Sequence, residues 1–220
     1  MSTFSKFYSQ FNQDKYLEEN VFKGYKNGVF FDVGAHDGVT FNNTLYFAKF
    51  NKWTGVNVEP IKNVYDKLVV NRPYAINLNC AVSNNDGEAE FILNTGYTEM
   101  LSGLKKNYDS RHKARLENEI NKKGGKIQII NVSTKKIETI CDEHNIKHIN
   151  YLSIDVEGAE FDVIKSINFD KVFIDVIEFE NNYDDKSVPI INYLESKNYV
   201  VIHKSIDIFM IHKNSIFYNK

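Results

Sequence analysis

Carboxylate side chains are unusually dense in the segment 155–160, which reads DVEGAE and follows a hydrophobic run at residues 151–154. Carboxylates that crowd together raise one another's pKa, so one of them can act as a base or the group can hold a cation. We interpret Asp155 and Glu157 as functional side chains at the end of a strand. Glu160 is interpreted instead as an acid in the first turn of a helix, where a negative charge is favourable.

A second acidic segment, FIDVIEFE at residues 173–180, follows one strand later. Side chains alternate between the two faces of a strand, and a site lies beyond its end, so Glu178 or Glu180 is a better candidate than Asp175. Hard cations take oxygen ligands, and Asp155 with Glu178 could hold Mg²⁺ or Mn²⁺. We favour a site without metal over this alternative.

A glycine turn, DVGAHDG at residues 32–38, joins a hydrophobic strand to a helix. Gly34 and Gly38 permit tight backbone geometry, and the following helix start offers N–H groups to a polar ligand. A dinucleotide fingerprint has its second glycine two residues after the first, where this sequence has His36. The wider turn, with Asp32 and Asp37 beside it, suits a cofactor without a pyrophosphate, because these acids can accept hydrogen bonds from an ammonium or a hydroxyl.

Two further strand ends complete a candidate nucleoside site. Glu59 precedes Pro60 about 20 residues beyond the glycine turn, a spacing at which an acid can accept from both ribose hydroxyls. Residues 79–82 (NCAV) end a third strand and offer backbone groups and a small apolar surface for an adenine ring. We interpret Cys80 as a packing residue rather than a nucleophile.

Short hydrophobic strands alternate with helical patterns, which predicts an α/β fold with a parallel sheet and right-handed crossovers. In such a sheet the ligand lies beyond the carboxyl ends of the strands. The expected helices include one at 134–144, capped by Ser133 or Thr134. The expected strands lie at residues 29–33, 53–58, 74–78, 88–93, 127–132, 151–154, 172–179, 199–203 and 206–212. The other expected helices lie near residues 41–50, 61–70, 159–167 and 189–197.

Composition bounds the classes of protein that the sequence can encode. The chain has 220 residues, of which 42% are hydrophobic and 25% charged, and its net charge is −2. We therefore expect one domain over residues 1–220, without a net charge that would attract it to nucleic acid or acidic membranes. The sequence has neither a signal-peptide pattern nor an apolar run long enough for a bilayer. Cys80 and Cys141 lack metal-ligand spacing, which favours a reduced, cytoplasmic protein.

Two segments stand outside the alternating pattern. Residues 1–28 are expected to form an N-terminal helical segment, and residues 97–126 an insertion that covers the acceptor. The insertion carries eight Lys or Arg against four acids. A phosphate-bearing acceptor such as a nucleotide-sugar would suit this charge, and a solvated helix face would explain it equally well.

Taken together, these motifs resemble the FkbM-like family of S-adenosylmethionine-dependent methyltransferases over about residues 10–203. The resemblance implies a Rossmann-like class I methyltransferase fold, with a seven-stranded, mostly parallel sheet, helices on both faces and an antiparallel last strand at 206–212. Asn42 stands where the family has a helix-opening serine. The motifs that carry the resemblance are SQFNQD at 9–14, the glycine turn, NNT at 42–44, WTG at 53–55, EP at 59–60, NR at 71–72, AVS at 81–83 and DVEGAE at 155–160. The cofactor contacts that it implies are Asp32, Gly34, Ala35, His36, Gly38, Asn43, Thr44, Glu59, Pro60, Cys80, Ala81 and Asp155.

The resemblance also implies O-methylation of a hydroxyl on a sugar, nucleotide-sugar or related small metabolite. A hydroxyl is a poor nucleophile, so a base must take its proton during attack. We expect Asp155 or Glu157 to be that base and Glu178 to orient the acceptor. His36 could also act as a base, but we favour the interpretation that it supports the site through hydrogen bonds. A nicotinamide-dependent oxidoreductase is disfavoured by the glycine spacing, and a non-catalytic nucleoside-binding or interaction module remains the alternative.

Overall fold

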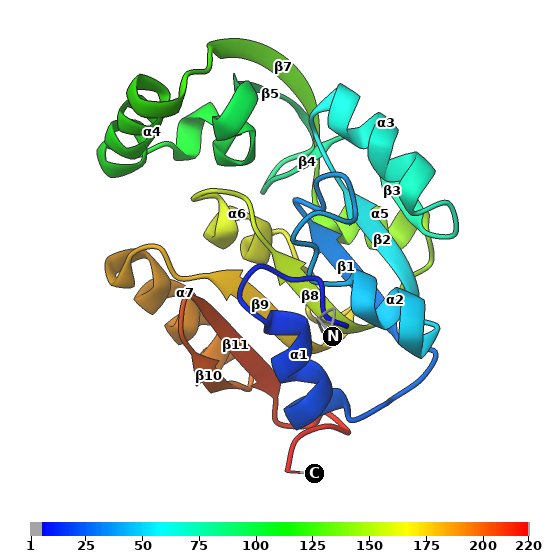
Figure 1. The fold of residues 1–220 in the computed structure, drawn as a ribbon. Coiled ribbons are helices and arrows are strands. Elements are labelled where there is room, and N and C mark those ends of the chain that lie inside the picture. The colour runs from blue at the N-terminus through cyan, green and yellow to red at the C-terminus, as the bar shows by residue number, and fades with distance from the viewer. Residues whose placement is uncertain (1–5, 220) are drawn as a thin grey trace, which may run out of the picture.

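The computed structural model describes residues 6–219 as an α/β fold around a mixed sheet of seven strands (Figure 1). The strand order is β10-β11-β9-β8-β1-β2-β3. β11 runs antiparallel to both of its neighbours, and the other pairings of this sheet are parallel. Its strands are β1 (Val29–Val33), β2 (Thr54–Val58), β3 (Ile76–Leu78), β8 (His148–Ile154), β9 (Phe173–Glu180), β10 (Tyr199–Lys204) and β11 (Asp207–His212).

The register of the central strands decides which residues meet beyond them. Val33 of β1 lies opposite Val58 of β2 and Ile154 of β8. Ile154 in turn lies opposite Phe179 of β9. Because these strands are parallel, their carboxyl ends meet at one edge of the sheet. The residues that come next along the four strands therefore emerge side by side: Gly34, Glu59, Asp155 and Glu180.

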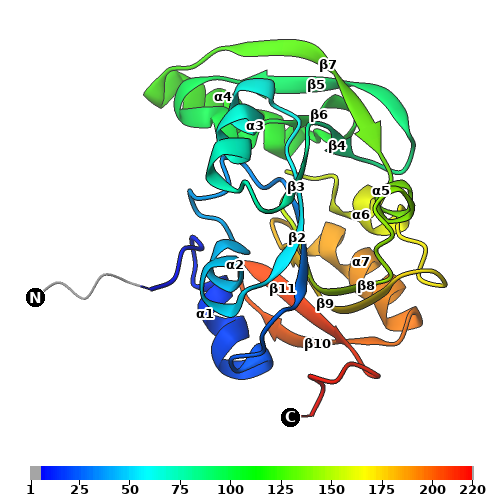
Figure 2. The ribbon, with the colours of Figure 1, turned by 90° about the vertical axis from the view of Figure 1, so that its right-hand side faces the viewer.

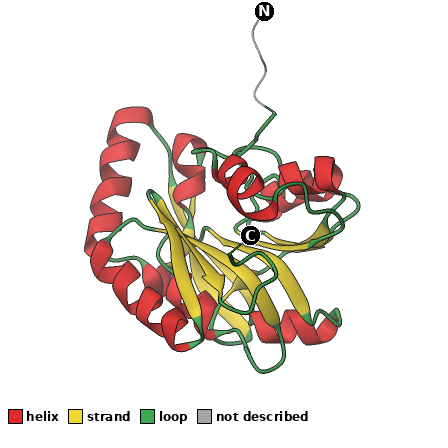
Figure 3. Cartoon of the chain, turned by 90° about the horizontal axis from the view of Figure 1, so that it is seen from below, coloured by secondary structure: helices red, strands yellow, loops and turns green. Residues whose placement is uncertain are grey.

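Helices cover both faces of the sheet (Figure 3). One face packs Phe22 and Phe47 against Tyr151, in a cluster that includes the N-terminal helical turns and α2. The other face packs Ile140, Ile164 and residues of α7 against β8 and β9. The helices of these two layers are α1 (Gln13–Leu17), continued by a π-helical turn at Glu18–Phe22, α2 (Leu45–Asn51), α5 (Ile137–Glu143), α6 (Glu160–Lys165) and α7 (Asp184–Ser196).

A second, four-stranded sheet rises above the carboxyl edge of the first (Figure 2). Its strands, in the order β4-β7-β5-β6, are β4 (Ala81–Val82), β7 (Ile127–Lys135), β5 (Gly87–Asn94) and β6 (Gly103–Leu104). The expected strands at 88–93 and 127–132 are confirmed as parts of β5 and β7. The separate sheet was not expected, since the β5–β7 pairing joins segments more than thirty residues apart.

The insertion at 97–126 belongs to this second layer. It contains short 3₁₀ turns at Gly96–Leu101 and Lys105–Asn107, strand β6, and the helix α4 (Ser110–Lys123). Asp109 caps α4, because its carboxylate accepts the backbone N–H of His112 at 2.9 Å.

Some expected boundaries are wrong. Ser133 and Thr134 do not cap a helix, because β7 continues to Lys135 and Thr134 pairs with both Gly87 and Ala81. The helix expected from residue 134 begins at Ile137 and has no side-chain cap.

α3 occupies Lys62–Asn71, within one residue of the expected 61–70. Two other helices begin away from their expected positions. The helix expected near 41–50 begins at Leu45. The helix expected from Pro189 begins at Asp184 and contains this proline. In the part of the chain that the structure describes, no helix has the length and apolar character to cross a bilayer.

Candidate active site

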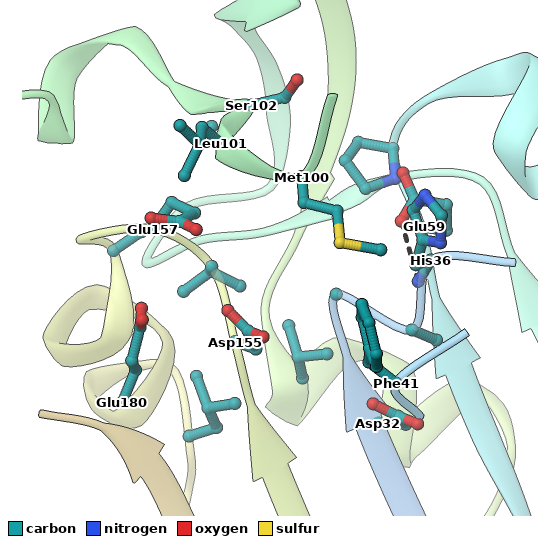
Figure 4. A pocket seen from close by; sticks show the side chains of 18 of the residues that line it. Asp32, His36, Phe41, Glu59, Met100, Leu101, Ser102, Asp155, Glu157 and Glu180 are labelled. Carbon is teal, nitrogen blue, oxygen red and sulfur yellow. Dashed lines mark hydrogen bonds between the residues drawn. The ribbon is translucent and has the colours of Figure 1, made fainter. Parts of the chain in front are cut away.

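A cavity of about 590 Å³ opens at the carboxyl ends of β1, β2, β8 and β9, beneath the second sheet (Figure 4). The glycine turn and the end of β2 form one side, and the segment after β8 together with the end of β9 forms the other. Residues of the insertion, Glu99 to Leu104 with Arg115 and Glu119, line it from above. The cavity therefore lies where the sequence predicts the ligand of an α/β sheet.

The glycine turn packs directly on the start of the acidic segment. Gly34 has a φ of +86°, and a Cβ there would lie 1.9 Å from the carbonyl oxygen of Asp155, so another residue would have to push the backbone apart. The N–H groups of Gly34 and Ala35 both donate to the Val58 carbonyl, at 3.0 and 3.1 Å. The Asp155 N–H donates to Val33 at 3.0 Å. Three strand ends are thus joined at one point.

The sequence predicts N–H groups for a ligand at a helix start directly after the turn, but α2 begins only at Leu45, seven residues beyond Gly38. Within the turn, besides Gly34 and Ala35, the N–H of Gly38 donates to Ala35 and that of Thr40 to Asp37. We therefore expect the turn to contact a ligand through its surface and the neighbouring side chains rather than through a row of backbone N–H donors.

Asp32 is buried in the wall of the cavity, and one of its oxygens is held by two donors. This oxygen accepts from Asn42 Nδ2 at 2.9 Å and from Thr44 Oγ1 at 2.8 Å. Arg72, at the end of α3, is buried in the same network and donates to Asn42, Thr44 and the Gly38 carbonyl at 3.0–3.2 Å. Burial raises the pKa of Asp32, and the charge of Arg72 and the two hydrogen bonds oppose this rise.

Glu59 is 4% exposed and lies beside the glycine turn, on the same side of the cavity. Its Oε1 accepts the N–H of Ile61 at 2.7 Å, and its Oε2 accepts the N–H of His36 at 3.1 Å (Figure 4). Each oxygen keeps a lone pair for a further donor. Burial is the main cause that raises the pKa of Glu59 to about 7.

The His36 side chain connects the turn to the insertion. Its Nε2 lies 3.3 Å from Glu99 Oε1, and its Nδ1 lies 3.6 Å from Asp37. Met100, the next residue of the insertion, points between His36 and Asp155 in Figure 4. These contacts support the interpretation of His36 as a hydrogen-bonding support.

The end of the third strand supplies an apolar wall. Cys80, Ala81 and Val82 line the cavity together with Ile61 and Phe91, and all five are buried. Burial raises the pKa of the Cys80 thiol to about 11, so it stays protonated at neutral pH. This agrees with the expectation that Cys80 is not a nucleophile.

An acidic group faces this wall from the other side of the cavity. One carboxylate oxygen each of Asp155, Glu157 and Glu180 lie within 4.8 Å of one another (Figure 4). Asp155 is accessible to solvent inside the cavity, although protein surrounds it on most sides. Burial is the largest cause that raises the pKa of Asp155 to about 7, of Glu157 to about 8 and of Glu180 to about 10, and repulsion among the carboxylates adds to each.

The pair expected to hold a cation was Asp155 with Glu178, and the structure groups Asp155 differently. Glu180, two residues further along β9, lies beside Asp155 because the strand ends are in register. Glu178 is 1% exposed, lines the same cavity and accepts a hydrogen bond from the Tyr151 hydroxyl. Burial raises its pKa well above the ordinary value. Glu160 is the first residue of α6, as expected.

Most expected site residues meet at this cavity. Gly38 and Thr44 do not line it: Gly38 packs on Arg72 and Leu68, and Thr44 supports Asp32. The expected residues that do line it are Asp32, Gly34, Ala35, His36, Asn43, Glu59, Pro60, Cys80, Ala81, Asp155, Glu157 and Glu178.

Other residues of the site were missed. Gln10, Phe11 and Gln13 form a wall, and Gln13 Nε2 donates to Asp207 at 2.6 Å. The motif at 9–14 was the signal for them, but no chemistry had been assigned to it. Phe41 lines the cavity with a φ of 53°, unusual for a bulky residue, and nothing in its type indicated this.

A cavity at the carboxyl edge of an α/β sheet, with a glycine turn and strand-end acids, is typical of α/β proteins that bind a small molecule. A family model described as "Methyltransferase FkbM domain" matches residues 32–201. The chain therefore belongs to the FkbM methyltransferase family, and it is a methyltransferase. A search of curated proteins finds no match. Methyltransferases in general take the methyl group from S-adenosylmethionine.

Proposed function

We propose that the cavity binds S-adenosylmethionine and that the protein transfers its methyl group to a hydroxyl of a sugar or a related small metabolite. One observation carries this proposal: the register of β1, β2 and β8 places Gly34, Glu59 and Asp155 around a single cavity. The cavity has a buried carboxylate at one end, an acidic group at the other and an apolar wall between them.

The residues at the Glu59 end fit an adenosyl group. The Glu59 carboxylate has lone pairs left for the two ribose hydroxyls, and Ile61, Cys80, Ala81 and Phe91 offer the apolar surface that an adenine ring needs. The cofactor supplies a methyl group on a positively charged sulfur. The carboxylates of Asp32 and Asp155, which line the middle of the cavity, are complementary to that charge.

Asp155 is the residue that we assign as the base. Its pKa of about 7 places it near neutrality, where a carboxyl group is an effective proton acceptor for a hydroxyl. Asp155 also lies between the Glu59 end and the Glu157 end of the cavity (Figure 4). The unpartnered oxygen of Glu178 is available to orient the acceptor.

A nicotinamide-dependent oxidoreductase is not favoured by this geometry. A pyrophosphate needs backbone donors at the glycine turn. The N–H groups of Gly34, Ala35 and His36 are already bonded to Val58 and Glu59. A non-catalytic binding module would not need an accessible carboxyl poised near neutrality at the centre of its cavity.

Calorimetry with S-adenosylmethionine, S-adenosylhomocysteine and NAD tests this proposal. Both adenosyl compounds should bind, and NAD should bind at least about 100-fold more weakly. An absence of binding heat with either adenosyl compound would overturn the proposal.

The pH dependence of binding tests the role of Glu59. The ribose hydroxyls favour the ionised carboxylate, whereas burial keeps Glu59 protonated below pH 7 in the free protein. The affinity for S-adenosylhomocysteine should therefore fall by up to about tenfold per pH unit below pH 7 and level off above about pH 8. Glu59→Gln should bind more weakly and flatten this profile. An unchanged profile in that variant would remove Glu59 from the role.

A further inference from the structure

The ionisable side chains that line the cavity are almost all acids. Among the described residues that line it, nine are acids, and Arg115 and His36 are the basic ones. The acids are Asp32, Glu59, Glu99, Glu119, Asp155, Glu157, Glu178, Glu180 and Asp207. A cavity of this kind repels anions and concentrates cations.

The basic residues of the insertion do not alter this field inside the cavity. Of the eight Lys or Arg between residues 97 and 126, Arg115 is the one that lines it. Others point to partners elsewhere: Lys105 pairs with Glu90 at 2.9 Å, Lys106 with Asp162 at 3.0 Å and Arg111 with Asp185 at 2.8 Å. The structure therefore gives a phosphate-bearing acceptor little support.

The acidic group of Asp155, Glu157 and Glu180 has lone pairs that no protein donor satisfies. Glu157 is 8% exposed, and its Oε2 has no hydrogen-bond partner within residues 6–219. The nitrogen atoms of His112 (Nδ1, 3.6 Å) and Arg115 (Nη1, 4.0 Å) are too distant for a hydrogen bond, and burial lowers the pKa of His112. Glu180 Oε2 is also buried without a partner in the described chain.

Glu178 carries a further unsatisfied oxygen in the wall of the same cavity. It lies outside the group of three, is 1% exposed, and lines the cavity from the strand that carries Glu180. Its Oε2 accepts from Tyr151, whereas its Oε1 has no donor in the described part of the protein. Buried polar atoms are rarely left unsatisfied, and a cationic donor would satisfy these oxygens and keep the carboxyl groups ionised.

From these observations we infer that the methyl acceptor carries an ammonium group, and that Glu157 and Glu180 bind this ammonium beside the hydroxyl that Asp155 deprotonates. An amino sugar or another amino alcohol has this chemistry. The inference rests on the proposed function and specifies its substrate class.

The spacing of the oxygens suits an ammonium. Three oxygens no more than 4.8 Å apart can all lie about 2.8 Å from one nitrogen, the length of a charge-assisted hydrogen bond. An ammonium has three donors, one for each carboxylate. A divalent cation would have to complete its coordination with water, and Arg115, 4.0 Å from Glu157 Oε2, repels a doubly charged ion more strongly than a singly charged one.

The surroundings suit an organic body attached to the ammonium. Phe11, Met100, Leu101 and Ile206 line the same cavity, and three of them are substantially exposed there: Phe11, Met100 and Ile206. A carbon skeleton can pack on these side chains while its charged end reaches the carboxylates. Because Asp155 belongs to the group, the ammonium and the reacting hydroxyl must lie only a few bonds apart.

Matched small probes test the inference on protein saturated with S-adenosylhomocysteine. The probes are trans-2-aminocyclohexanol, cyclohexylamine, cyclohexanol and cyclohexyl phosphate, and ligand-observed NMR measures their affinities. Both amines should bind at least about tenfold more tightly than cyclohexanol, and the phosphate should bind most weakly. In the double variant Glu157→Gln/Glu180→Gln, amine affinity should fall to that of cyclohexanol.

Controls separate this outcome from unfolding and from failure of the proposed function. Glu119→Gln, which neutralises a lining acid outside the group, should change amine affinity less than about twofold. The double variant should keep its affinity for S-adenosylhomocysteine, and its unfolding temperature should be no lower than that of the wild-type protein. If the cofactor product binds but neither amine does, or if phosphate or alcohol binds as tightly as the amines, the inference is wrong while the proposed function stands.

A metal is the remaining competitor, and the same variants distinguish it. Mn²⁺ added alone, followed by its effect on water proton relaxation, should show no site that the double variant removes. A Mn²⁺ site that is lost with Glu157 and Glu180, and that excludes the amines, would replace the ammonium with a metal ion and overturn the inference.

Discussion

Asp32 and Asp155 lie at the same edge of the sheet on neighbouring strands, yet the protein surrounds their charges in opposite ways. Asp32 has two hydrogen-bond donors on one oxygen and the buried guanidinium of Arg72 nearby. Asp155 has two further carboxylates within 4.8 Å instead of a cation. In the Asp32 region, hydrogen bonds and the charge of Arg72 compensate the carboxylate and hold the glycine turn. In the Asp155 region, the carboxylates lack such hydrogen-bond donors.

This difference indicates which part of the cavity binds a ligand. A buried carboxylate that has donors and a nearby cation is compensated within the protein, and removing one partner is costly. Buried carboxylates without donors cost free energy in the absence of a ligand, and such sites are typically functional. Both regions line one cavity. We therefore expect Asp32 to maintain the shape of the cavity, and Asp155, Glu157 and Glu180 to interact with the bound ligand.

The largest expected effect comes from the unpaired region. Asp155→Asn keeps the shape of the side chain but removes the proton acceptor, so turnover should fall by about 10³-fold. Turnover is measured as release of S-adenosylhomocysteine with a hydroxyl acceptor that the wild-type protein methylates. The affinity for S-adenosylhomocysteine should change less than about threefold.

Asp162→Asn is the matched control for that variant. Asp162 lies on α6 outside the cavity lining and pairs with Lys106, so its loss should leave turnover within about twofold. Near-normal turnover in Asp155→Asn would show that another group, such as Glu157 or His36, takes the proton.

In the paired region the expected effect is on stability. Arg72→Met leaves Asp32 buried without its cation and removes hydrogen bonds to Asn42, Thr44 and Gly38. Breaking a buried pair from one side typically costs about 3–5 kcal/mol, and we expect the free energy of unfolding to fall by about 3 kcal/mol. Urea denaturation followed by circular dichroism measures this change.

Arg111→Met is the comparison that isolates burial. Arg111 also makes several hydrogen bonds to carboxylates, but it is exposed, so its loss should cost less than about 1 kcal/mol. Equal losses in the two variants would mean that Arg72 acts as a surface residue and that Asp32 does not depend on it.

Much of the site could be predicted from the sequence because its residues stand at strand ends. Gly34, Glu59 and Asp155 each follow a short hydrophobic run, and such runs are visible without a structure. Parallel strands then bring their carboxyl ends to one edge whatever the details of packing. The alternation of strands and helices and the antiparallel last strand are confirmed for the same reason.

What the sequence did not predict depends on register and on long-range contacts. The choice of Glu180 over Glu178 as the neighbour of Asp155 follows from the pairing of Ile154 with Phe179. Arg72 reaches the glycine turn from the end of a helix 34 residues beyond Gly38. No local sequence pattern predicts that an arginine makes such a contact. No local pattern predicts the second sheet either, because its strands β5 and β7 pair across the whole insertion.

The smallest expected effect is a gain in stability in the unpaired region. Burial, with the charge of Asp155, raises the pKa of Glu157 to about 8 from an ordinary value of 4.5. Above pH 4.5 the unfolded chain loses this proton while the folded protein retains it up to about pH 8. Stability therefore declines as the pH rises through that window and levels off above it.

Glu157→Gln cannot ionise, so it should be more stable than the wild-type protein, by about 1–2 kcal/mol at pH 8.5 and by little at pH 5. Thermal unfolding of both proteins at the two pH values measures the gain, and Glu195→Gln, at an exposed position on α7, should show none. A loss of stability in Glu157→Gln, or a gain that does not grow with pH, would mean that Glu157 already has a cationic partner. Since Arg115 lies 4.0 Å from its Oε2, that partner would be this arginine, and the acidic group would then resemble the Asp32 network.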